Sequence, residues 1–524
     1  MAEMAPISMS LSQRSEQDNL KVELKKSENV TEIDIGPGTV EDLDDAEVFL
    51  RDNGISHGRL RELLDDKDAQ KRLLRRVDLT LLPLLCGTYM LQYLDKQVLS
   101  YSAVFDLFSS TGISSAQYSW LVSIFYFAYL GAEWPLSYLA QHYATGTIIS
   151  IFTICWGIIL ACTATCSNFA TLAVCRFILG IFEAVITPSF LLIIGTWYTR
   201  QEQPARVGAF TCFIGVGSMA GGILFVATGQ SKGWDIWRTN FVLCGGITIL
   251  WGVILLIFLP NSIFAAKRFT LEEKAMLIAR SQTNNTGVYS RTIKWGHVKQ
   301  ALSDVQVWLL FLFVLLNETI NGGIASFGKL IVQGFTDSAI LTTAYGIPYG
   351  AWCTFFMFTG PWIASRLKDS RTTVMVLYVL PTLIASCLFW KLPRTNQKGL
   401  LMAYYICPSY TGACFLALQM PSANFGGYTK RVTGSAIVFL AYCTGNIVGP
   451  HAFIASEAPI YQTGCKVIIG CVVGQIVIAL LLRALLIRRN KKRDTDASLS
   501  EYECVDETLQ DVTDFENKNF RYVY

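Results

Sequence analysis

Residues 241–259 read FVLCGGITILWGVILLIFL, a run of nineteen residues without a charged side chain, and a second apolar run follows at 306–330. An α-helix rises 1.5 Å per residue, so runs of this length span the ~30 Å hydrocarbon core of a bilayer. The interval between them, 260–305, is long and polar. The two runs therefore predict membrane-spanning helices on either side of a central polar loop.

The same pattern continues outward in both directions, with six runs before the central loop and six from its end onward. The predicted spans lie at 79–98, 118–139, 147–166, 169–193, 207–227, 241–259, 306–330, 341–364, 373–391, 401–420, 433–453 and 465–487. Composition agrees, because 52% of residues are apolar and only 16% are charged, against about 25% charged in soluble proteins. We expect an all-α membrane protein of twelve transmembrane helices in two six-helix pseudo-repeats.

The domain organisation follows from these runs and from the polar segments around them. We expect a disordered tail at 1–70, a first half at 71–259, a central loop at 260–305, a second half at 306–487 and a final tail at 488–524. Lys and Arg near the run ends gather on the side that holds both tails and the central loop, which predicts that this side is cytoplasmic. The few on the opposite side are Lys232, Arg238, Lys329, Lys391, Arg394, Lys398 and Lys466.

Most of the 15 cysteines lie inside the apolar runs, without a CxxC pair or a histidine at metal-ligand spacing. We interpret them as small membrane-buried hydrophobes. No nucleophile–base pair, metal set or phosphate-binding loop is recognisable. We therefore expect no cofactor, no metal, no enzymatic activity and no nucleic-acid partner.

Ionisable side chains inside membrane helices are unfavourable unless they are paired or face water, so each is a functional candidate. The candidates are Asp95, Lys96, Glu133, Arg176, Glu183 and Glu318. Arg176 and Glu183 are seven residues apart, close to two helical turns, so they share a helix face. An anion site needs a fixed cation, for which Lys96 or Arg176 is suited. A proton-coupled site needs a carboxylate, for which we predict Glu183 together with Asp95; alternatively, Asp95 and Arg176 pair only to hold two helices together.

The seventh run adds two amides and a carboxylate. Asn317 and Asn321 stand at i and i+4, on one helix face, and are predicted to bind either a carboxylate or an amide-bearing substrate. Glu318 lies between them and is a further candidate for proton coupling. Helix-to-helix hydrogen bonding is the alternative role for these amides.

Two other segments are candidates for helix bending. Pro135 follows Glu133 in the second run and frees a backbone carbonyl, so Glu133 either lines the transport path and takes part in proton coupling or belongs to a structural kink. Gly445, Asn446 and Pro450 place helix-weakening residues in the eleventh run. A bend there would gate the outer mouth, and static packing is the alternative.

Six runs on each side of a cytoplasmic loop resemble the major facilitator superfamily, whose substrates bind between the two halves. Several strings are more specific: Tyr93-Leu94-Asp95-Lys96, Gln117-Tyr118-Ser119-Trp120, Arg176 with Glu183-Ala184 and Pro188, Asn321-Gly322-Gly323, Gly445 to Pro450, and the tail from Asp511 to Tyr522. These resemble the fungal allantoate permease group of the anion:cation symporters. Lys96 and Glu318 depart from the commonest pattern of that family.

The resemblance implies secondary active, proton-coupled uptake of a small organic anion at the plasma membrane. Substrates of the wider family include ureido acids such as allantoate, vitamins and amino-acid-like carboxylates. We expect the organic anion, protons and the lipid bilayer as partners, and a monomeric protein with both termini in the cytoplasm. The alternatives are an exporter of a drug or secondary metabolite, although the fifth run lacks the proline of the antiporter motif, and a non-transporting nutrient sensor.

Overall fold

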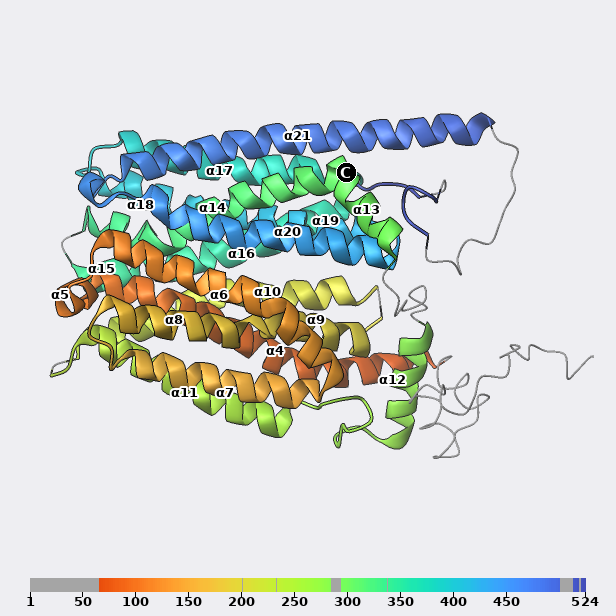
Figure 1. The fold of residues 1–524 in the computed structure, drawn as a ribbon, viewed down its shortest axis with the longest axis horizontal. Helices are drawn as coiled ribbons and strands as arrows, with labels where there is room; N and C mark the ends of the chain where they lie inside the picture. The colour runs from red at the N-terminus through yellow and green to blue at the C-terminus, as the bar shows by residue number, and fades with distance from the viewer. Residues whose placement is uncertain are drawn as a thin grey trace, which may run out of the picture. The chain divides into compact units, whose positions relative to one another are not determined.

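The computed structural model describes residues 66–199, 201–231, 233–283, 294–336, 338–499, 512–517 and 520–524 of the 524-residue chain. Within those ranges the backbone forms α-helices, short 3-10 turns and loops, with no β-strand. Figure 1 shows the long helices running side by side, with α7 and α11 at one edge and α21 at the other. The predicted all-α fold class is confirmed.

Two sets of helices flank the central interval. The first set is α4 (Lys67–Val104), α5 (Leu107–Thr111), α6 (Ser115–His142), α7 (Thr145–Thr163), α8 (Phe169–Ala184), α9 (Ile186–Trp197), α10 (Gln203–Thr228) and α11 (Ile236–Phe258). The second set is α14 (Val305–Gln333), α15 (Ala339–Ala344), α16 (Gly346–Arg366), α17 (Arg371–Lys391), α18 (Gln397–Ile406), α19 (Tyr410–Asn424), α20 (Tyr428–Val448) and α21 (Gln462–Leu499). We call the end where α4 begins and α21 ends the terminal end, and the opposite end the far end.

Among the described residues, ten helical segments are long and apolar enough to cross a membrane. The two remaining predicted spans correspond to α6 and α16. Both contain many Tyr, Trp, Ser and Gly residues, which lower the average hydropathy of a helix. Both nevertheless pack inside the bundle, α6 against α8 and α20, and α16 against α10 and α19.

Three predicted single spans are divided in the structure, and each division has a proline close by. Pro188, Pro348 and Pro408 lie four residues after Ala184, Ala344 and Tyr404, respectively. Proline has no N–H to donate to the carbonyl four residues earlier. The helix accordingly ends at Ala184 and Ala344 in the first two cases and tightens into a 3-10 turn at Cys407–Ser409 in the third.

Close helix packing depends on small residues, as between α7 and α11. A Cβ atom on Gly157 would lie 2.8 Å from the backbone nitrogen of Ile249, and one on Gly245 would lie 2.6 Å from that of Ala161. Small residues at such crossings let helix backbones approach one another in a membrane. These glycines therefore bring α7 and α11 into direct contact.

The central interval contains two helices of its own, α12 (Leu271–Thr283) and α13 (Trp295–Ser303), although it was predicted as a loop. Arg76 on α4 places its Nη1 2.7 Å from Oε1 of Glu273 on α12. This ion pair holds α12 against the terminal end of the bundle. The predicted N-terminal tail lies outside the described residues up to residue 65, and α4 begins at Lys67, capped by the side chain of Asp66.

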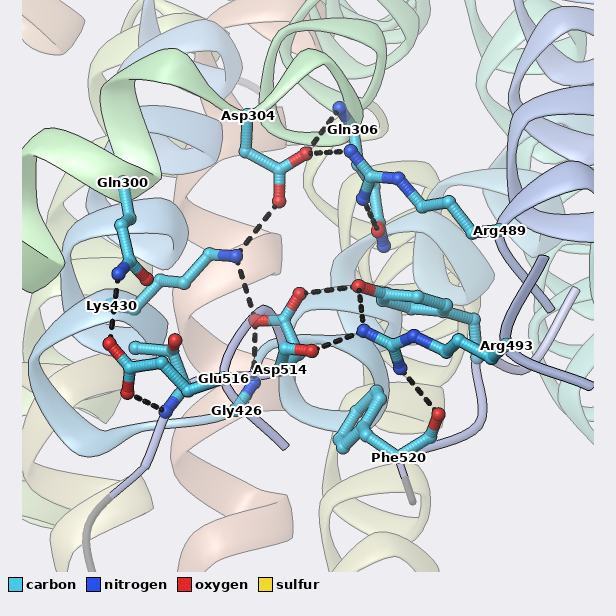
Figure 2. A network of polar contacts seen from close by, with 12 residues as sticks. Gln300, Asp304, Gln306, Gly426, Lys430, Arg489, Arg493, Asp514, Glu516 and Phe520 are labelled. Atoms are coloured by element: carbon cyan, nitrogen blue, oxygen red, sulfur yellow. Dashed lines mark hydrogen bonds and ion pairs between the residues drawn. The ribbon is translucent and has the colours of Figure 1, made fainter. Parts of the chain in front are cut away.

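The final segment packs against the terminal end of the second set of helices (Figure 2). The Nζ of Lys430, at the start of α20, lies 2.7 Å from Oδ1 of Asp514 and 3.0 Å from Oδ2 of Asp304, and all three side chains are fully buried. Arg489 on α21 adds a 2.7 Å ion pair to Asp304. One lysine thus joins the tail to the start of α14.

Further hydrogen bonds hold the last residues in place. Asn424 and Val523 exchange two hydrogen bonds of 2.8 Å each. The hydroxyl of Tyr522 donates to Oδ2 of Asp514 at 2.7 Å. Burial and the nearby Asp514 carboxylate raise the pKa of Tyr522, which keeps this hydroxyl protonated. The predicted tail from residue 488 is therefore ordered in part, as the end of α21 and as this docked segment.

Candidate substrate and proton-coupling site

An ion pair lies inside the first set of helices. The Nζ of Lys96 on α4 is 3.6 Å from Oε2 of Glu183 on α8. The side chain of Glu183 has no exposed area, whereas 23% of that of Lys96 is exposed. Lys96 is therefore the more accessible partner of this pair.

Two aromatic rings of α6 surround the lysine. The Nζ of Lys96 lies 5.5 Å from the ring centroids of both Phe125 and Tyr129. Ring faces attract a cation and leave its hydrogen-bond donors available. The two rings therefore stabilise the ammonium, whose one ion pair within 4 Å among the described residues is with Glu183.

Asp95 and Arg176 are both buried but do not form the ion pair that was the alternative prediction. Asp95 accepts a 3.0 Å hydrogen bond from the hydroxyl of Thr248 on α11. The guanidinium of Arg176 lies 5.5 Å from the ring centroid of Phe241, also on α11. Within the described part of the chain, no Asp95–Arg176 nitrogen–oxygen distance falls within 4 Å. The structure brings Lys96 and Glu183 together instead.

A second polar cluster lies in the other set of helices, around Glu318 on α14. Its Oε2 accepts from Nδ2 of Asn446 at 2.8 Å and from Nδ2 of Asn321 at 3.1 Å. Its Oε1 accepts from the thiol of Cys414 at 2.9 Å. The hydroxyl of Tyr410 donates to Oδ1 of Asn321 at 3.0 Å, which completes the cluster.

The two predicted amides of α14 have different surroundings. Asn317 is fully buried, and its Nδ2 donates to the backbone oxygen of Tyr410 at 3.1 Å. It thus makes the helix-to-helix contact that was the alternative role. Asn321 instead joins the Glu318 cluster. Tyr410 and Cys414 carry no charge, so nothing in the sequence around them marks them as site residues.

At the two segments predicted to bend, one helix is continuous and the other changes from α-helix to a 3-10 turn. Pro135 lies inside α6, which continues to His142. Glu133 is partly buried, and the described residues give it no ion pair. The eleventh helix remains α-helical through Asn446 to Val448 and continues as a 3-10 turn at Gly449–Ala452. A Cβ atom on Gly445 would lie 2.6 Å from that of Glu318, so this glycine allows α14 and α20 to pack closely.

Hydrogen bonds join the two sets of helices toward the far end. Ser119 on α6 donates to the backbone oxygen of Pro450 at 3.2 Å, and Ser123 donates to that of Ile447 at 2.8 Å. Ser100 on α4 donates to the backbone oxygen of Ser326 on α14 at 3.1 Å. These contacts form a seam between the halves on the far-end side of Lys96.

Comparison with known proteins identifies this architecture. The sequence model of the Major Facilitator Superfamily matches residues 85–450. The chain belongs to the major facilitator superfamily. Members of this superfamily are transporters. The expectation that this protein is a transporter and not an enzyme is therefore confirmed.

Its relatives include fungal transporters of the same superfamily. An uncharacterized transporter of Schizosaccharomyces pombe is 33% identical over 93% of each chain. The allantoate permease of Saccharomyces cerevisiae is 32% identical over 88% of each chain. The resemblance to the allantoate permease group is thereby confirmed.

A solved structure supports the major facilitator fold. A bacterial homolog of the human lysosomal transporter Spinster, in an inward-facing and unoccupied conformation, superposes with a TM-score of 0.58. The match is 18% identical in sequence and covers 77% of this chain and 95% of that one. At this identity the likeness concerns the fold alone.

Proposed function

We propose that this protein is a proton-coupled symporter that carries a small organic anion into the cell. The observation that carries the proposal is the Lys96–Glu183 ion pair, in which the cation is partly exposed and the carboxylate is fully buried. The substrate's carboxylate binds Lys96, and Glu183 carries the coupled proton.

Charge balance couples anion binding at Lys96 to proton uptake by Glu183. When a substrate anion pairs with the ammonium of Lys96, a charged Glu183 would lose its ion-pair partner in a fully buried position. Leaving a buried charge unpaired costs about 3–5 kcal/mol, so anion binding favours proton uptake by Glu183. Conversely, release of the proton restores the internal ion pair and expels the anion. Anion and proton therefore move together.

The Glu318 cluster contributes the opposite wall of the site. In the superfamily the substrate binds between the two halves, and Asn321 belongs to the half that faces Lys96. Its two amide N–H groups donate to Glu318 and Asn446. Its amide oxygen accepts from Tyr410 and keeps a second lone pair for a donor at the uncharged end of a substrate. An amide- or ureido-bearing carboxylate such as allantoate matches both a cation on one side and amides on the other.

Orientation and location are part of the proposal. Basic residues gather at the terminal end, so this end faces the cytoplasm, and the far end with its seam faces outward. The relatedness to the yeast allantoate permease supports a plasma-membrane location. We propose a monomer as the transporting unit, with the halves rocking about the central site.

Uptake assays test the proposal. Radiolabelled allantoate, ureidosuccinate, nicotinate, pantothenate and cysteine are offered to yeast that lacks its own related permeases, at external pH of about 5 and about 7.5. The expected result is faster uptake of one compound at the lower pH, abolished by a protonophore. Absence of uptake together with reduced retention of a preloaded metabolite would instead indicate an exporter.

A further inference from the structure

A second membrane-buried lysine lies outside the central site. Lys329 on α14 carries a charge that sequence alone assigned to the far-end surface, yet it is only 5% exposed. The reason is its position at the seam between the halves, where α4 packs over α14. A charge buried to this extent requires partners that compensate it.

Its partners all come from α4, in the other half. The ammonium donates to Oε1 of Gln97 and, at 3.4 Å, to the hydroxyl of Ser100. It also lies 3.9 Å from the ring centroid of Tyr101. In the part of the chain that the structure describes, no carboxylate pairs with this lysine.

Uncharged partners compensate a buried ammonium only in part. Removing a charge from water without a counter-charge is unfavourable, and lysine has three donors to satisfy. The side-chain oxygen of Gln97 occupies the place that a carboxylate oxygen would take. Separation of the halves at the far end would withdraw Gln97, Ser100 and Tyr101 together, because all three belong to α4.

We propose that Lys329 is the cation of an outer binding site for the carboxylate of the transported anion. When the far end opens, the anion binds Lys329. When it closes, Gln97 and Ser100 replace the anion, which moves on to the central site. This inference rests on the proposed function, since it assumes an anionic substrate that enters from the far end.

The geometry of α4 connects the two sites. Lys96 and Ser100 are four residues apart, so they lie on one face of the helix, about 6 Å apart along its axis. Ser100 contacts Lys329 in the closed seam. An anion released from Lys329 therefore has the next cation, Lys96, about one turn farther inward.

The test distinguishes anion binding by Lys329 from a purely structural role of Lys329 at the seam. The full chain is reconstituted in liposomes, and half-saturation is measured for influx and for efflux with radiolabelled allantoate or whichever of the five anions above the wild type carries. Lys329→Gln should raise the external half-saturation concentration at least about tenfold, the loss expected for a charge-assisted hydrogen bond. The internal value should stay within about twofold, because Lys329 is covered by Gln97 whenever the site faces inward.

A second variant predicts the opposite change. Gln97→Ala removes the competitor for Lys329 and should lower the external half-saturation concentration about two- to fivefold, with slower turnover. Lys398→Gln removes an exposed charge at the same end and is the matched control, expected to change neither value. If Lys329→Gln does not reach the membrane, the direction in which Gln97→Ala changes the external half-saturation concentration decides between anion binding and a structural role for Lys329.

Each of the following results would overturn the proposal. Equal changes of half-saturation in both directions, or a change in maximal rate alone, would reduce Lys329 to a seam contact. An unchanged or raised external value in Gln97→Ala would exclude competition. If the wild type carries none of the anions, both the proposed function and this inference are wrong. If Lys329→Gln transports the anion with normal kinetics, this inference alone is wrong.

Discussion

The ammonium of Lys96 and the carboxylate of Glu183 lie 3.6 Å apart on two helices of the first half, with the carboxylate fully buried and the ammonium partly exposed. The pair differs from a static helix-to-helix ion pair in this asymmetry. In the proposed function, the substrate anion binds the partly exposed cation, and a proton neutralises the buried carboxylate behind it. The predictions for the central site follow from this arrangement.

Replacement of Glu183 by glutamine should uncouple transport. The variant keeps the size of the side chain but cannot exchange a proton, so accumulation against a gradient is lost while exchange of preloaded for external substrate continues. Concentrative uptake and counterflow in the same vesicles measure the two activities. Normal pH-driven accumulation by Glu183→Gln would remove Glu183 from the mechanism.

Replacement of Lys96 should weaken anion binding. A hydrogen bond to a charged group contributes about 1.5–3 kcal/mol, so Lys96→Ala is expected to raise the apparent KM about tenfold or more. Lys368→Ala removes an exposed lysine near the terminal end and serves as the control. A KM that does not change in Lys96→Ala would transfer the binding role to Arg176 or to the α14 amides.

Replacement of Glu318 should affect substrate selection more than coupling. Glu318 accepts hydrogen bonds from Asn321, Asn446 and Cys414, and Glu318→Gln introduces a donor where three donors already point. The reoriented Asn321 amide should change the ratio of KM values for ureido and simple carboxylates, while the pH dependence of uptake persists. Loss of pH dependence in this variant would make Glu318 a proton carrier instead.

The docked tail predicts a stability effect. Lys430→Met leaves Asp304 and Asp514 buried without their shared cation, and breaking a buried ion pair destabilises by about 3–5 kcal/mol. The apparent Tm of the purified full chain should fall by several degrees. Asp494→Asn disrupts the exposed ion pair with Arg521 and is the control, worth at most about 1 kcal/mol. Equal Tm values for Lys430→Met and Asp494→Asn would show that the docked tail contributes little to the stability of the fold.

The helices and the charged site residues could be predicted from the sequence, for physical reasons. Apolar runs of bilayer length have few structural alternatives, and a charge within such a run stands out because it is unfavourable there. Lys96 and Glu183 were both found in this way. The sequence left open which cation pairs with which carboxylate, because that depends on how α4, α8 and α11 rotate against one another.

Other features depend on packing that no local pattern reveals. Pro188, Pro348 and Pro408 lie at interruptions of their helices, yet Pro83, Pro135 and Pro361 lie inside continuous ones. The difference depends on how neighbouring helices satisfy the freed carbonyls. Likewise, Lys329 was expected at the surface, because its burial requires the contact of α4 with α14 across the seam.

If anion and proton enter together, anion uptake is accompanied by proton movement, which can be measured. Vesicles containing the full chain, without an imposed pH gradient, receive allantoate, or whichever of the five anions above the chain carries, while a pH-sensitive dye reports the external medium. The wild type should make the medium more alkaline as the anion enters, whereas Glu183→Gln should not. Anion entry without any change in external pH, or with acidification, would exclude proton-coupled symport.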